Sequence, residues 1–230
     1  MGTKSYFEEV APQWDKMRQS FFSEAVREKA LRVAGVQPGK IAADIGAGTG
    51  FMTEGLVERG VRVIAVDLAE AMLKEMKRKF KESETIDYRL GDSEHLPVDD
   101  DTVDYVFGNM VLHHVESPIK AIREMVRILK PGGILILTDL DEHRFEFLKH
   151  EHRDRWMGFK RESLKEWLRG AHLKNISVDC AGENCCAASS CGCESASISI
   201  FIASGQKKTR KEHSEWGVET KKTKNQPLGD

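Results

Sequence analysis

A glycine-rich run at residues 43–50 is the segment of this 230-residue chain best suited to bind a ligand. It closes a short apolar stretch at residues 41–45 and precedes a helical pattern that begins near Phe51. Glycine permits positive φ angles and a close approach of the backbone to a bound group, and the free N–H groups of a new helix face the same crevice. The run therefore predicts a nucleotide-type pocket. Its candidate binding residues are Asp44, Gly46, Ala47, Gly48 and Gly50.

The spacing of these glycines distinguishes between kinds of nucleotide pocket. They fall as G-x-G-x-G, whereas the NAD fingerprint places two residues before its third glycine. A carboxylate, Asp44, also lies two residues before Gly46, where an NAD-binding strand usually ends in an apolar residue. This pattern resembles motif I of the class I S-adenosylmethionine (SAM) dependent methyltransferases, and an NAD enzyme or an inactive relative is the alternative.

Two further acids follow apolar strand patterns. Residues 61–66 read as a buried strand that ends at Asp67, next to Leu68, and residues 86–90 read as a strand followed by Asp92 and Ser93. An isolated Asp after a strand is usually a helix cap or a turn residue. Three such acids in this order favour a cofactor site instead. The resemblance implies that Asp67 holds the ribose hydroxyls and that Asp92 faces the adenine amino group.

A fourth strand is predicted at residues 102–107, and Asn109, His113 and His114 follow it. This segment resembles the methyltransferases of ubiquinone and menaquinone biosynthesis. The resemblance implies that Asn109 contacts the methionine end of SAM and that His114 lies near the methyl group. Each histidine is equally compatible with a packed structural role. The run 130–133, Lys-Pro-Gly-Gly, predicts a sharp turn into a fifth strand at residues 134–137.

All five cysteines lie in one short segment with the spacing C-x4-C-C-x4-C-x-C. They are Cys180, Cys185, Cys186, Cys191 and Cys193. The spacing does not match paired C-x2-C zinc knuckles, and an odd count in a reducing compartment argues against a disulfide framework. Soft thiolates favour zinc, copper(I), an iron–sulfur cluster or trivalent arsenic. We expect a thiophilic ion here, and a reduced loop or an adventitious disulfide is the alternative.

The alternating strand and helix patterns predict one α/β sheet, and the resemblance implies the Rossmann-like class I methyltransferase fold. Its seven-stranded sheet is mostly parallel, with strand six near residues 175–179 and an antiparallel strand seven near residues 197–204. Because strand six ends at the ligand-binding rim of such a sheet, the cysteine loop 180–193 should share a rim with the SAM pocket. The domain itself is expected to span residues 35–206.

Two flanking segments are predicted beside this domain. Apolar residues at helical spacing in residues 1–34 indicate packed helices, and the family resemblance implies that this segment is an N-terminal helical lid over SAM, with Tyr6 and Trp14 closing the pocket. Residues 207–230 are polar and basic and predict a solvated tail.

Composition limits the choice of compartment and partner. A chain that is 40% hydrophobic can bury a substantial core, and no apolar run approaches the ~20 residues of a membrane span. With no secretory signal pattern at the N-terminus, a cytoplasmic location is expected. The net charge of −2 gives no general attraction to nucleic acid, so the expected partner is a small molecule, and the oligomeric state is not indicated.

The sequence therefore predicts a SAM-dependent methyltransferase acting on a small-molecule acceptor. No Asn/Asp-Pro-Pro-Tyr signature of nucleobase-amine methylation follows the fourth strand. For an alcohol or a carbon acid, a base would help, and the candidates are His113, His114, Asp139 and Asp141. A distant similarity to arsenite methyltransferases leaves a thiol-bound metalloid open as acceptor, and a SAM-binding thiol or metal sensor is the alternative function.

Overall fold

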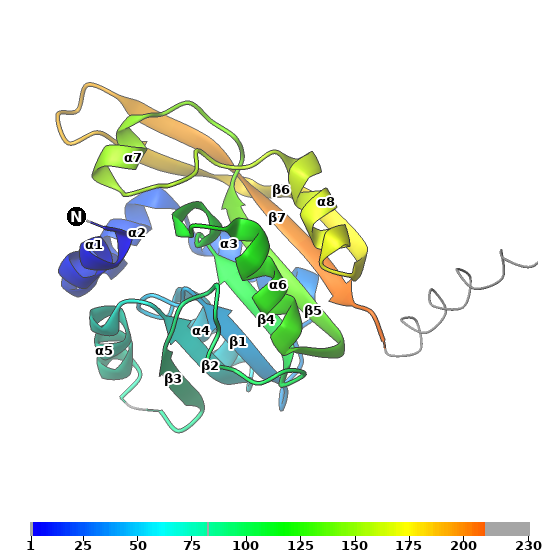
Figure 1. The fold of residues 1–230 in the computed structure, drawn as a ribbon. Coiled ribbons are helices and arrows are strands. Elements are labelled where there is room, and N and C mark those ends of the chain that lie inside the picture. Colours follow the sequence, from blue (N-terminus) through cyan, green and yellow to red (C-terminus); the bar gives the residue numbers. More distant parts are fainter. Residues whose placement is uncertain (1, 82, 210–230) are drawn as a thin grey trace, which may run out of the picture.

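The fold is built on one seven-stranded sheet, seen in a computed structural model that describes residues 2–81 and 83–209 (Figure 1). The strands are β1 (Ile41–Ile45), β2 (Arg62–Asp67), β3 (Ile86–Leu90), β4 (Val103–Asn109), β5 (Leu129–Leu140), β6 (Leu173–Ala188) and β7 (Ser195–Lys207). Their order in the sheet is β3-β2-β1-β4-β5-β7-β6. Only β7 runs antiparallel to its neighbours, so the predicted class I methyltransferase topology is confirmed.

Helices cover both faces of this sheet. They are α1 (Thr3–Val10), η1 (Ala11–Gln13), α2 (Trp14–Phe21), α3 (Glu24–Ala34), α4 (Phe51–Glu58), α5 (Glu70–Lys79), η2 (Leu112–His114), α6 (Pro118–Ile128), α7 (Phe147–Glu151) and α8 (Arg161–Gly170). Helices α3, α4 and α5 pack in one apolar layer, and α6 and α8 pack in the layer on the other face. Among the described residues, no helix has the length and apolar character needed to span a bilayer.

The central strands place the candidate ligand-binding residues at one edge of the sheet. Strand β1 pairs with β2 and β4 in register, so Ile45 lies opposite both Val66 and Gly108. The residues that follow these positions are the glycine run, Asp67 and Asn109. Parallel strands buried on both faces are continuously apolar, and β2 from Val63 to Val66 has this character. The carboxyl ends of these strands therefore lie side by side at one edge of the sheet.

The last two strands differ from the prediction. Strand β6 is much longer than residues 175–179, and it forms a long hairpin with β7 in place of the predicted cysteine loop. Residues 130–133 belong to β5, where Gly132 has a φ of +84°. Lys207 ends β7 and its Nζ lies 2.8 Å from Asp101 Oδ1, so it is not part of a tail. The predicted tail from residue 210 onward lies outside the described residues.

Side-chain hydrogen bonds tie the N-terminal helices to elements at the carboxyl edge of the sheet. The carboxylate of Glu8 accepts hydrogen bonds from the backbone N–H groups of Glu70 and Ala71 at the start of α5. The carboxylate of Asp15 accepts a hydrogen bond from the hydroxyl of Thr49 at 2.5 Å. Figure 1 shows α1 beside α5 accordingly.

Candidate functional site

A cavity of about 360 Å³ opens at the carboxyl edge of the central strands; we call it the main cavity. Nine of the residues predicted to bind a cofactor line it: Gly46, Ala47, Gly48, Asp67, Leu68, Asp92, Ser93, Asn109 and His114. The N-terminal helices contribute Phe7 and Trp14 to its wall. Asp44 and Gly50 do not line it. Residues from five separate segments therefore meet around one space.

The glycine run turns tightly because three of its glycines adopt positive φ angles. Gly46, Gly48 and Gly50 have φ values of +65°, +54° and +94°. A Cβ atom on Gly46 would lie 2.5 Å from Val111 Cγ2, and one on Gly50 would lie 2.5 Å from the ring of Phe80. Gly46 thus lets the loop pass close to the segment after β4, whereas Gly50 serves the packing of α4 against α5.

Asp67 fixes the shape of the loop while facing the main cavity. Its Oδ2 accepts the backbone N–H of Gly48 and its Oδ1 accepts that of Ala69, both at 2.8 Å. Burial raises the pKa of this carboxyl above its usual value, and the two backbone donors act against that rise. Each carboxylate oxygen has a second lone pair, so Asp67 retains the capacity to accept hydroxyl donors from a ligand.

Asp44 plays a different part, because it is 2% exposed and turned away from the cavity lining. Its Oδ2 accepts the backbone N–H of Thr53 at 3.0 Å and the Thr53 hydroxyl at 2.7 Å. These bonds tie the end of β1 to the first turn of α4. Burial raises the pKa of Asp44 to about 6, despite both hydrogen bonds. Asp44 therefore positions the loop from beneath.

A second pocket of about 60 Å³ adjoins the main cavity. Five residues line both spaces: Phe7, Trp14, Phe22, Met110 and His114. The far wall of the second pocket is formed by Tyr6, His113, Leu148, His152, Asp154, Cys185 and others. Its wall is mostly apolar, with a few polar groups gathered on one side, which is the usual character of a small-molecule site.

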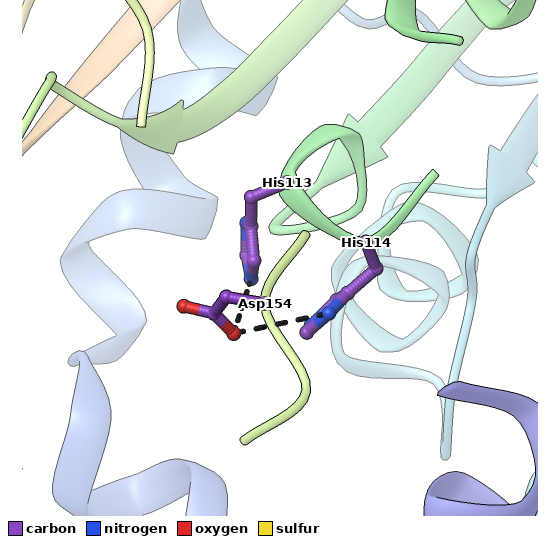
Figure 2. A group of neighbouring side chains, drawn as sticks. All are labelled: His113, His114 and Asp154. Atoms are coloured by element: carbon purple, nitrogen blue, oxygen red, sulfur yellow. Dashed lines mark ion pairs between the residues drawn. The ribbon is translucent and has the colours of Figure 1, made fainter. Parts of the chain in front are cut away.

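Those polar groups centre on two adjacent histidines and one aspartate (Figure 2). His113 Nε2 and His114 Nδ1 lie 3.8 Å and 3.9 Å from the same oxygen of Asp154. Burial disfavours a charged His113, but Asp139 and Asp154 outweigh it and raise its pKa to about 9. Burial and the neighbouring His113 hold the pKa of His114 well below its usual value. Burial raises the pKa of Asp154 to about 6.

The four base candidates separate by their contacts. Asp139 is fully buried. Its carboxylate is hydrogen-bonded to the His113 ring and accepts hydrogen bonds from the backbone N–H groups of Leu112 and Leu140. Asp141 forms a two-point ion pair with Arg161 at 2.8 Å and 2.6 Å. Neither aspartate lines a pocket of the site, whereas both histidines do. Only His113 and His114 are therefore placed to face an acceptor.

The cysteines do not form the predicted cluster. Cys185 and Cys186 are neighbours in β6, so their side chains point to opposite faces: Cys185 is buried against the second pocket and Cys186 is exposed. Cys180 is also exposed, and the Gly182 N–H lowers the pKa of its thiol. Among the described residues, no three cysteine sulfurs approach one another closely enough to share an ion.

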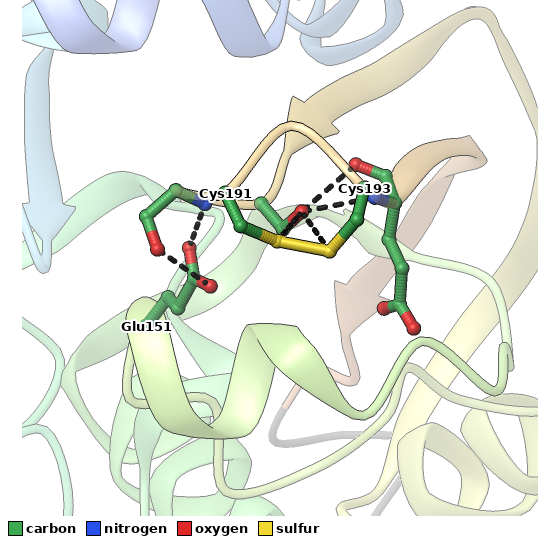
Figure 3. Close-up of a disulfide and its surroundings, with 6 residues drawn as sticks. Glu151, Cys191 and Cys193 are labelled. Atoms are coloured by element: carbon green, nitrogen blue, oxygen red, sulfur yellow. Dashed lines mark hydrogen bonds between the residues drawn. A yellow bond between two sulfur atoms is a disulfide. The ribbon is translucent and has the colours of Figure 1, made fainter.

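Cys191 and Cys193 are joined by a disulfide at the tip of the β6–β7 hairpin (Figure 3). The Ser189 hydroxyl lies 3.4 Å and 3.7 Å from their two sulfurs, and Glu151 of α7 accepts the Ser190 N–H at 2.8 Å. An ion held by all five cysteines is therefore not supported: Cys191 and Cys193 form the disulfide kept as the alternative, and strand alternation turns Cys185 and Cys186 to opposite faces.

Sequence reasoning did not find Asp154 or His152. Asp154 meets His113 across about 40 positions of sequence in a polar stretch with no regular pattern, so no local signal marks it. Tyr6, predicted to close the SAM pocket, instead lines the second pocket, and its hydroxyl lies 3.4 Å from His152 Nδ1. Trp14 lines both spaces.

Comparisons with known proteins agree with this architecture. Residues 43–137 match the family model described as a methyltransferase domain. A demethylmenaquinone methyltransferase from Renibacterium salmoninarum is 33% identical over 142 residues, which cover 60% of this chain and 59% of that protein. The chain thus spans less than two thirds of the length of this relative.

Two solved structures share the fold. The cyclase SpnF superimposes with a TM-score of 0.72 at 14% identity, covering 91% of this chain and 98% of that one. The phosphoethanolamine N-methyltransferase 2 of Haemonchus contortus, solved with SAM, gives 0.67 at 17% identity, covering 80% of this chain and 52% of that one. At these identities the likeness concerns the fold. Residues 43–137 therefore match a methyltransferase domain, and the described chain has the class I SAM-dependent methyltransferase fold.

Proposed function

We propose that the protein transfers a methyl group from SAM, bound in the main cavity, to a small molecule bound in the second pocket. The observation that carries this proposal is the sharing of five wall residues by the two spaces, because a donor and an acceptor in adjoining sites can meet without crossing solvent. The demethylmenaquinone methyltransferase similarity supports a small-molecule acceptor.

The residues of the main cavity fit the parts of SAM. Asp67, at the end of β2, has lone pairs left for the ribose hydroxyls, and Asp92 and Ser93 lie beyond β3 for the adenine edge. Leu68 is 42% exposed although it lines a cavity, so it offers an apolar surface to a base. Asn109 and His114 also line this cavity, and His114 lines the second pocket as well.

The chain's main contribution would be alignment and exclusion of water. SAM itself supplies an activated methyl group on a sulfonium. Phe7 packs edge-on against both Trp14 and His114, with ring centroids 5.4 Å and 4.9 Å apart, and so closes the junction of the two spaces. Holding donor and acceptor in line in such a site contributes about 7–11 kcal/mol to a reaction of this kind.

The second pocket favours a compact, largely apolar acceptor with one polar reacting group. That group would lie toward His113, His114 and Asp154, where a proton can be accepted or a hydrogen bond donated. A metalloid held by several thiolates is not supported, because Cys185 is the only cysteine in the wall. The alternative of a thiol-based sensor loses its support for the same reason.

The experiment measures S-adenosylhomocysteine release with a panel of small apolar alcohols, enols, amines and thiols. The Ala187→Leu variant places a larger side chain in the second pocket, whereas Ala188→Leu, its neighbour on the exposed face of β6, is the matched control. We expect Ala187→Leu to abolish turnover while SAM affinity stays within about twofold, and Ala188→Leu to change neither. Turnover that survives in Ala187→Leu, or no release with any acceptor, would contradict the proposal.

A further inference from the structure

The side-chain group in Figure 2 has the geometry of a metal site. His113, His114 and Asp154 each offer one ligand atom, and these three atoms lie within 4.8 Å of one another. Ligand atoms around a transition ion with bonds of about 2.0–2.2 Å lie about 3–3.5 Å apart. The observed separations of 3.8 Å and 3.9 Å from Asp154 are close to this range, and binding an ion would draw the three side chains together from within the 4.8 Å that bounds the set.

The histidine His113 is also supported as a metal ligand by its other nitrogen. Its Nδ1 lies 2.6 Å from Asp139 Oδ1, and Nε2 faces Asp154. A carboxylate that accepts the second ring N–H of a ligating histidine is the usual outer partner in protein metal sites, where it fixes the tautomer and orients the ring. Asp139 is itself held by backbone N–H groups, so this support is rigid.

His114 presents its Nδ1 with little competition. The nearest polar partner is the Arg153 carbonyl at 3.5 Å, at the long limit of a hydrogen bond. The group is enclosed, since the side chains of His113 and Asp154 are 7% and 4% exposed and that of His114 is 13% exposed. His152, on the same pocket wall, has a buried Nε2 with no hydrogen-bond partner among the described residues. The pocket thus contains histidine nitrogens whose hydrogen bonds to the described residues are long or missing.

We propose that His113, His114 and Asp154 bind a divalent first-row transition metal ion in the wall of the second pocket. Two imidazoles and one carboxylate form a donor set that suits zinc and iron(II) and leaves coordination positions open. Those positions would face the second pocket, which all three residues line. If the proposed function holds, the ion would bind the acceptor's polar atom beside the methyl donor. His114 lies at the junction of the two spaces.

The test is titration of the purified full-length protein with Co²⁺ and Zn²⁺, in a background where the exposed Cys180 and Cys186 are changed to Ser. We expect one Co²⁺ per chain, visible as d–d absorption of a low-coordinate ion, and its displacement by Zn²⁺. Asp154→Asn and His114→Gln should each weaken Co²⁺ binding at least tenfold. His150→Gln on α7, an exposed histidine outside both pockets, is the matched control and should leave it unchanged.

The rival interpretation is an ion pair between His113 and the two aspartates with no metal. Failure of the background protein to bind Co²⁺ or Zn²⁺, or binding that persists in both Asp154→Asn and His114→Gln with circular dichroism unchanged, would overturn the inference. The outcome is separable from the proposed function. Metal binding without methyl transfer would leave this inference standing and refute that function, and methyl transfer by a protein that binds no metal would do the reverse.

Discussion

Asp139 and His113 form a buried pair in which one carboxylate oxygen lies 2.6 Å from the ring Nδ1. The other oxygen accepts the backbone N–H of Leu112 at 2.9 Å, so the end of β5 is joined to the turn that carries both histidines. The orientation of His113 Nε2 toward Asp154 follows from this pairing. Strand β5 thus fixes the orientation of the His113 ring in the wall of the second pocket.

Removing the charge of Asp139 should weaken the site without removing a ligand. In Asp139→Asn we expect Co²⁺ affinity to fall about 10- to 100-fold, since outer partners of ligating histidines have effects of this size. The Co²⁺ absorption spectrum should keep its shape, because His113, His114 and Asp154 are intact. Asp141→Asn, two residues along and paired with Arg161, is the control. Equal affinities in both variants would show that Asp139 has no role in positioning.

Gly46→Ala should disrupt the loop for two separable reasons. A positive φ in a non-glycine residue costs about 1–2 kcal/mol, and the new Cβ would lie 2.5 Å from Val111 Cγ2. We expect a loss of unfolding free energy, measured by urea denaturation, that Val111→Ala partly restores in the double variant. Gly132→Ala, with a φ of +84° and open space around it, should show the backbone cost alone. An unrestored double variant would contradict the packing argument.

The raised pKa of buried Asp44 should make the free energy of unfolding depend on pH. Its folded-state pKa of about 6 lies above the unfolded value of about 3.9, so the folded state binds more protons between these values. The stabilising contribution is complete below about pH 4 and is lost as pH rises through about 6. Compared with the non-titrating Asp44→Asn variant, wild-type protein should lose up to about 3 kcal/mol of unfolding free energy from pH 4 to 7.

The measurement is urea denaturation of both proteins across this range, with the exposed acid variant Asp87→Asn as a control. A difference between wild-type protein and Asp44→Asn that stays constant with pH would contradict the burial argument.

Trp14 should matter more for turnover than for folding. It lines both spaces, and its Nε1 lies 3.4 Å from the position of a Cβ on Gly48. We expect Trp14→Ala to lower kcat/KM about tenfold, because an aromatic contact of about 1.4 kcal/mol at the reacting junction is lost. Thermal denaturation provides the comparison, and Trp156→Ala, outside both pockets, is the control. Parallel losses of activity and stability would assign Trp14 to packing alone.

The central strands and the cofactor edge could be predicted because their signals are local. Buried parallel strands are continuously apolar, glycines mark the turn, Asp67 ends β2, and Asp92 lies two residues after β3. The long β6–β7 hairpin escaped prediction because the strand pattern of β6 is interrupted at Gly182, where the pairing with β7 shifts register, and because the cysteines resembled a ligand-binding loop.

The second pocket could not be predicted because its polar wall is assembled from distant segments. His113, Asp154 and Cys185 come from η2, from the stretch after α7 and from β6. Only the three-dimensional packing of these segments brings them together. The separation of Cys185 from Cys186 has a different, local cause: a strand turns alternate side chains to opposite faces, and this follows once β6 is known to be a strand.

The measurement that tests the account most directly is SAM binding by isothermal calorimetry to wild-type protein, Asp67→Ala and Asp87→Ala. Asp67 faces the main cavity, whereas Asp87 lies exposed on the adjacent strand β3 in an ion pair with Arg89. We predict one SAM per chain and a loss of affinity of about 10- to 100-fold in Asp67→Ala, since a hydrogen bond to a charged group is worth about 1.5–3 kcal/mol. Asp87→Ala should bind as wild type does. Unchanged affinity in Asp67→Ala, or no SAM binding by the wild-type chain, would contradict the account.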